Sequence, residues 1–133
     1  MKNDQLERWQ ELCAQAEGGL QDMARILVVS NDKVLLQTRR MLLESNGYEV
    51  VASLGYEASV EQCKRGGFDL FILGHSMPQA DKQKLVSTFR RECPAPIISL
   101  LRPNEAPLAD ADYHIEPDPV KLLELVDGLL KAA

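Results

Sequence analysis

Short apolar runs alternate with longer stretches of helical periodicity along most of this chain. The run at residues 70–73 (Leu-Phe-Ile-Leu) contains no polar residue and lies between glycines at positions 66–67 and 74. Such a run predicts a strand buried on both faces, as in the middle of a parallel sheet. Four similar runs predict further strands, and the five together cover residues 25–29, 48–52, 70–73, 97–101 and 113–115.

Between these runs, apolar residues recur at every third or fourth position, which is typical of helices that bury one face. Such helices are expected over residues 33–45, 57–65, 81–93 and 119–130. Strands that alternate with helices predict parallel β-α units. The predicted fold class is therefore α/β, a doubly wound five-stranded parallel sheet of the flavodoxin type with strand order 2-1-3-4-5.

The spacing also predicts which helical residues face the sheet. The first helix is expected to turn inward Val34, Leu35, Thr38, Met41 and Leu42. The second helix is expected to use Ala58, Val60 and Cys63. The third is expected to bury Leu85, Val86 and Phe89, and to leave in solvent Lys82, Lys84, Arg90 and Arg91.

An additional amphipathic helix is predicted over residues 3–17, before the first strand. One of its faces carries an apolar stripe formed by Leu6, Trp9, Leu12, Cys13 and Ala16. A Gly-Gly pair at positions 18–19 ends this helix, so the chain divides into residues 1–22 and a domain over residues 23–133. The stripe either packs on that domain or serves self-association or partner docking, which makes Leu6, Trp9 and Leu12 candidate interaction residues.

The composition excludes several classes of function. The chain has 133 residues and a net charge of -5, which argues against a general nucleic-acid binder because such proteins need a basic face. No apolar run approaches the roughly 20 residues of a membrane span, and the N-terminus has no apolar core like that of a signal peptide. The three cysteines follow no CxxC spacing, as expected in a reducing cytoplasm. Two histidines are too few for a closed metal site without cysteine or carboxylate ligands, so no metal site is expected. No cofactor is expected either.

Several segments resemble the receiver domains of response regulators (CheY-like). Residues 26–32 are similar to the family's first strand and the acidic pair after it, and residues 47–50 (Gly-Tyr-Glu-Val) to the start of its second strand. Residues 68–73, followed by Met77-Pro78, are similar to its third strand and exit. Weaker matches to the last two strands lie at residues 96–98, 111–113 and 117. The resemblance covers about residues 24–131 and implies a role in two-component or phosphorelay signalling.

In that family an aspartate at the end of the third strand is phosphorylated, and this sequence departs at every chemical position. The phosphoacceptor position is Gly74, which has no oxygen to attack a phosphoryl group. The acidic pair is Ser30 and Asn31, both weak ligands for Mg²⁺. The hydroxyl that reads the phosphoryl group is replaced by Leu101, and the lysine before the loop proline by Glu116. The resemblance therefore implies a degenerate pseudo-receiver, not an enzyme.

The stretch between the last two strands is shorter than in the family by roughly two helical turns. It contains Pro103 and Pro107, which oppose a continuous helix. The fourth helix of the receiver fold is therefore predicted to be shortened or missing. The family's loop usually has a cis proline, which predicts a cis peptide bond between Glu116 and Pro117. Asp32 and Asp81 are expected to cap helices.

Two further residues are candidates for contacts with other molecules. His75 lies beside Gly74 at the functional edge of the sheet, and Tyr113 occupies the aromatic position of the family's switch. The leading hypothesis is a non-catalytic module that acts through a signalling partner (a kinase or a regulator) or through self-association, independently of phosphorylation.

Two alternatives remain open. One is a small-molecule sensor that uses the space left by Gly74, and the other is an architectural homo-oligomer held by the N-terminal helix. Neither nucleic acid nor a membrane is an expected partner, and the expected location is cytoplasmic.

Overall fold

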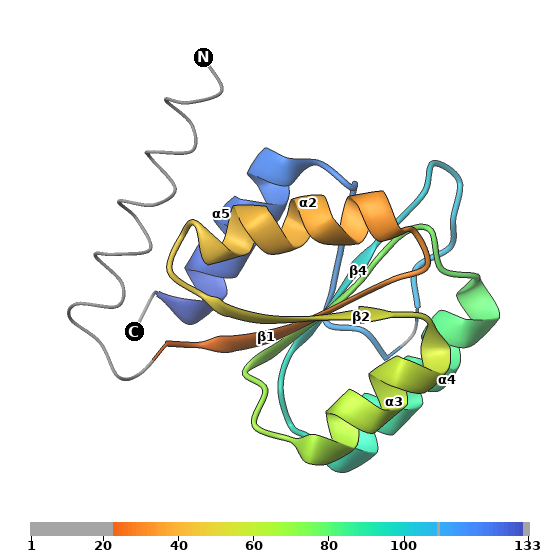
Figure 1. Ribbon diagram of the computed structural model, residues 1–133. Coiled ribbons are helices and arrows are strands. Elements are labelled where there is room, and N and C mark those ends of the chain that lie inside the picture. The colour runs from red at the N-terminus through yellow and green to blue at the C-terminus, as the bar shows by residue number, and fades with distance from the viewer. Residues whose placement is uncertain (1–22, 109, 132–133) are drawn as a thin grey trace.

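Five parallel strands form one sheet in the computed structural model, which describes residues 23–108 and 110–131 (Figure 1). The strands are β1 (Arg25–Ser30), β2 (Glu49–Leu54), β3 (Leu70–Leu73), β4 (Ile97–Leu100) and β5 (Tyr113–Ile115). Their order is β2-β1-β3-β4-β5, and every neighbouring pair is parallel. The predicted fold class and strand order are confirmed. The predicted helix over residues 3–17, with Leu6, Trp9 and Leu12, lies outside the described residues.

In the described part of the chain, four helices cover the sheet in two layers. They are α2 (Lys33–Glu44), α3 (Tyr56–Arg65), α4 (Gln79–Glu92) and α5 (Pro119–Leu130). Figure 1 shows α2 and α5 on one face and α3 and α4 on the other. Because both faces are covered, all four residues of β3 are fully buried, as the unbroken apolar run predicts.

The start of α2 matches its prediction, and that of α4 does not. The carboxylate of Asp32 accepts hydrogen bonds from the backbone N–H groups of Val34 and Leu35, at 2.9 and 3.1 Å. In α4 the N-cap position is Pro78, and Asp81 lies inside the first turn. The prediction that Asp81 caps a helix is therefore wrong, because the helix begins two residues earlier.

The inward face predicted for α2 is wrong by a rotation of the helix. The buried residues are Leu36, Arg39 and Leu43, whereas Val34 is 73% exposed and Met41 is 42% exposed. Two sets of residues on this helix recur with the same helical period, and the set that contains Arg39 packs on the sheet. An arginine has a long apolar stem, so it can lie on a core face that a hydrophobicity pattern does not reveal.

Two smaller errors concern α3 and α4. Ala58 is exposed, and its neighbour Ser59 is buried, where its hydroxyl bonds Ser53 Oγ at 3.0 Å. Lys82, predicted to face solvent, is fully buried. The predicted inward residues of α4, by contrast, are all buried: Leu85, Val86 and Phe89.

No helix connects β4 to β5 in this stretch, of which the structure describes every residue except 109. Leu108, which is 2% exposed, fills the core from this connection instead. The predicted loss of the fourth receiver helix is therefore confirmed. The peptide bond between Glu116 and Pro117 is trans, so the predicted cis bond is wrong. The trans form is the more stable by about 0.5–1 kcal/mol, and here Glu116 turns outward to Lys121.

Candidate functional site at the carboxyl ends of the strands

The positions that correspond to a receiver's phosphorylation pocket lie at one edge of the sheet, but only some of them meet. Ser30 ends β1 and is fully buried, and Gly74 directly follows β3. A Cβ atom placed on Gly74 would lie 3.4 Å from Ser30 Cβ. Asn31 is exposed beside them, whereas Glu116 is turned away in an ion pair with Lys121.

The guanidinium of Arg39 fills the space that a side chain at position 74 would occupy. Its Nη1 atom lies 2.9 Å from the place of a Cβ atom on Gly74, and the carbonyl oxygen of Val29 lies equally close. Arg39 is only 7% exposed. Burial lowers the pKa of this guanidinium, and the nearby Asp32 carboxylate opposes that shift. An arginine stays protonated at neutral pH, so the sheet edge holds a buried cation.

His75 is the hydrogen-bond partner of this arginine. Arg39 Nη2 lies 3.0 Å from His75 Nδ1, and since a guanidinium can only donate, Nδ1 accepts and the ring proton is on Nε2. Burial lowers the pKa of His75, and the positive charges of Arg39, Lys82 and Arg102 lower it further. His75 is therefore neutral at pH 7.

Hydroxyl groups join the loops that follow β1 and β3. Ser30 Oγ lies 2.9 Å from Ser76 Oγ and accepts the backbone N–H of Asp32. Ser76 Oγ also accepts the backbone N–H of Asn31 at 3.0 Å. At this edge, serines thus carry the contacts between the two loops.

A buried ion pair ties α4 to the connection between β4 and β5. Lys82 Nζ donates to Glu105 Oε2 at 2.9 Å and to the carbonyl oxygen of Leu100 at 2.8 Å. The side chains of Lys82 and Glu105 are 0% and 4% exposed. Burial of the Glu105 carboxyl opposes its ionisation, but the N–H of Arg102 and the ammonium of Lys82 outweigh burial and lower its pKa. Burial lowers the pKa of Lys82, and Glu105 opposes that shift.

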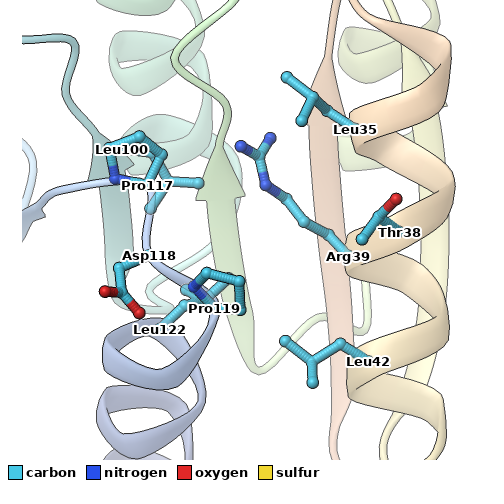
Figure 2. A pocket seen from close by; sticks show the side chains of 9 residues that line it. All are labelled: Leu35, Thr38, Arg39, Leu42, Leu100, Pro117, Asp118, Pro119 and Leu122. Atoms are coloured by element: carbon cyan, nitrogen blue, oxygen red, sulfur yellow. The ribbon is translucent and has the colours of Figure 1, made fainter.

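Two hollows flank this edge. The smaller, of about 70 Å³, is shown in Figure 2. There the Arg39 side chain extends from α2 toward Leu100, the last residue of β4, and Pro117, which follows β5. The larger hollow, about 490 Å³, lies at the ends of β4 and β5 and is lined by Leu101, Arg102, Pro103, His114, Ile115, Glu116 and Pro117. Two of the predicted pocket positions, Leu101 and Glu116, thus line a separate hollow.

Sequence reasoning did not place three charged residues of this site: Arg39, Lys82 and Glu105. Arg39 and Lys82 lie in helices, and Glu105 lies in a loop. Charged residues in such segments normally face solvent. Only the substitution at Gly74 offered a signal, because a missing side chain in a packed interior must be replaced by something. No cluster of three or more histidine, cysteine or acidic residues is arranged to hold a metal in the part of the chain that the structure describes.

Comparison with known proteins supports the fold. No family model matches the chain. Among solved structures, it is similar to a CheY-like receiver domain protein from Methanospirillum hungatei JF-1, at 24% identity and a TM-score of 0.72, over 84% of this chain and 96% of that one. It is also similar to the response regulator TrrA from Thermotoga maritima, solved with Mg²⁺ and BeF, at 27% identity and a TM-score of 0.72, over 81% and 100%.

A third similar structure is a receiver domain protein from Clostridium thermocellum, at 20% identity and a TM-score of 0.73, over 83% of this chain and 96% of that one. The chain therefore has the receiver-domain fold of two-component signalling. Among the described residues no helix is long and apolar enough to cross a membrane.

Proposed function

We propose that this chain is a pseudo-receiver, a signalling module that works through protein–protein contacts and without phosphorylation of its own side chains. The observation that carries the proposal is the Arg39 guanidinium, which lies where Gly74 lacks a side chain. A phosphoacceptor needs a carboxylate at this point and a divalent cation beside it. This site has a fixed cation and no carboxylate at position 74.

The remaining groups do not supply the missing chemistry. The oxygen of Asp32 that faces α2 is held by backbone N–H groups as a helix cap. The hydroxyls of Ser30 and Ser76 bond each other, and neither contacts a general base within residues 23–108 and 110–131. Leu101 and Glu116 bring neither a hydroxyl nor a cation to a phosphoryl group.

Contacts with a partner remain the means of signalling. Tyr113 is 37% exposed on β5, an edge strand of the sheet, and is, with His75, a candidate for such contacts among the described residues. The apolar stripe of residues 1–22 is a second candidate for partner docking or self-association. The expected partner is a kinase or another regulator.

A small-molecule sensor is the second candidate function, but at a different place from the one that Gly74 suggests. The space over Gly74 is filled by Arg39. The hollow of about 490 Å³ at the ends of β4 and β5 favours this candidate, because its size falls in the range of ligand pockets.

The test is incubation with acetyl phosphate and Mg²⁺, followed by intact-mass measurement. The chain is expected to gain no phosphate, whereas a receiver that retains its aspartate gains one. The matched variant is Gly74→Asp, which restores the carboxyl alone. It is also expected to stay unmodified, since Arg39 would pair with the new carboxylate and the other positions stay unchanged. A stoichiometric, base-labile phosphate on the unmodified chain would overturn the proposal.

A further inference from the structure

We propose that His75 and Arg39 form a binding site for a small oxyanion of the phosphate or sulfate class at the carboxyl edge of the sheet. The ring donor that remains available is His75 Nε2–H, since Nδ1 of the same ring is bonded to Arg39. No side chain or backbone group of the described residues bonds this Nε2 atom. A donor polarised by a guanidinium on its other nitrogen, and left without a partner, suits an anion.

The second observation is an unpartnered atom in the interior. Arg39 Nη1 is buried and has no hydrogen-bond partner within the described residues. Arg39 is only 7% exposed, and it forms no ion pair with any carboxylate of the described residues. The Asp32 carboxylate acts on Arg39 from nearby but forms no ion pair with it. A buried cation that no carboxylate touches is costly, and a bound anion offsets that cost.

The charges around His75 leave a positive excess. The positive charges of Arg39, Lys82 and Arg102 all act on the His75 ring, and the carboxylate of Asp32 opposes them. A second carboxylate, Glu105, is already paired with Lys82 and accepts the N–H of Arg102. Among the described residues these are three cations and two carboxylates, and Arg39 is the cation that no carboxylate contacts.

The site is reachable and lies where this fold binds ligands. His75 is half-buried, and Asn31, whose N–H bonds the adjacent Ser76, is exposed, as is Arg102. In open α/β sheets, ligands bind outside the carboxyl ends of the strands. The binding is non-covalent and requires no partner protein, so it goes beyond the proposed function. In a receiver the same edge collects a metal cation, whereas here the charges favour an anion.

The experiment is a titration of the full chain with inorganic phosphate, and separately with sulfate, while NMR follows the histidine ring signals at constant ionic strength. Sodium chloride is the reference salt. The second histidine, His114, is an internal control because its Nε2 atom is held by the backbone of Leu108. A saturable shift of the His75 signals is expected with both oxyanions, with no such shift for His114 and none in chloride.

Two arginine variants on one helix make the test specific. Arg39→Met is expected to weaken binding at least tenfold. Arg40→Met changes the next residue, an exposed arginine paired with Glu44, and is expected to leave binding unchanged. The proposal fails if both histidines shift in parallel without saturation, or if the two variants bind equally.

A thermal measurement covers the case in which Arg39→Met does not fold. Phosphate at a saturating concentration is expected to raise the Tm of the unmodified chain, because a ligand that binds only the folded state stabilises it. In His75→Phe this rise should be lost. An equal rise in His75→Phe would mean general salt stabilisation and would overturn the site. Neither readout involves covalent phosphate, so the phosphorylation test is judged separately.

Discussion

The buried pair of Lys82 and Glu105 should control the stability of this domain. The perturbation is Glu105→Gln, which removes one charge and keeps the size of the side chain. The ammonium of Lys82 would then remain 0% exposed on α4, with only neutral oxygens around it. Breaking a buried ion pair from one side costs about 3–5 kcal/mol. Glutamine still accepts from Lys82, so the lower end, about 3 kcal/mol, is expected.

The reverse substitution should cost less, because the two partners differ in their freedom to move. Lys82 is held within a helix, whereas Glu105 belongs to an irregular connection and lies 3.6 Å from the exposed Arg102. In Lys82→Met the carboxylate can therefore turn toward water. The cost is about 1–2 kcal/mol, mainly from the hydrogen bond lost at Leu100. The double variant should recover most of the stability that Glu105→Gln loses.

Urea unfolding followed by circular dichroism measures these differences, provided that the m-values of the variants agree. The control is Glu92→Gln, in which the partner Arg91 is 69% exposed and 3.6 Å away. That exposed pair is expected to contribute less than about 1 kcal/mol. The reasoning is refuted if Glu105→Gln is no more destabilising than Glu92→Gln, or if Lys82→Met costs more than Glu105→Gln.

Two further predictions concern the same edge of the sheet. Gly74→Ala should destabilise the fold by about 1–3 kcal/mol, because its Cβ would lie 2.9 Å from both Arg39 Nη1 and the Val29 oxygen. The control is Gly128→Ala, on α5, where an added Cβ would have no atom within 4 Å. This variant should stabilise the fold by about 1 kcal/mol in the same urea assay, and an equal loss of stability in both variants would contradict the prediction. The lowered pKa values of His75 and Glu105 both mean that the unfolded chain binds protons first as the pH falls. Stability should therefore fall as the pH drops below about 6.5, the ordinary pKa of histidine, and fall further near the ordinary pKa of glutamate. A Tm that stays constant between about pH 4 and pH 7 would contradict this.

The fold could be predicted from the sequence because its main signals are apolar and local. The run at residues 70–73 has no polar residue, as expected for a strand that is covered on both faces, and all four residues are buried. The connection between β4 and β5 was too short and too rich in proline for a helix, and none forms in its described part. The same kind of signal located the edge at which Ser30 and Gly74 meet.

The interior of the site could not be predicted in the same way. Hydrophobicity patterns assign arginine, lysine and glutamate to the surface, yet Arg39 and Lys82 are buried because distant segments supply their partners. His75 and Arg39 are 36 residues apart, and Lys82 and Glu105 are 23 apart. No local pattern encodes such pairs. The trans bond before Pro117 was missed for another reason. The cis bond was predicted from the family's loop and not from the residues of this chain.

In the sequence, the carboxyl edge of the sheet differs from a receiver by a missing side chain and a missing helix. In the structure, other residues occupy both places. The side chain absent at Gly74 is matched by the Arg39 guanidinium in the same space. The helix absent after β4 is matched by a connection that Glu105 anchors to Lys82. The first replacement also changes the local charge, because a cation that repels a metal now lies beside position 74, where a receiver has a carboxylate. Restoring one aspartate would therefore add a partner for Arg39 and leave Ser30, Asn31, Leu101 and Glu116 as they are.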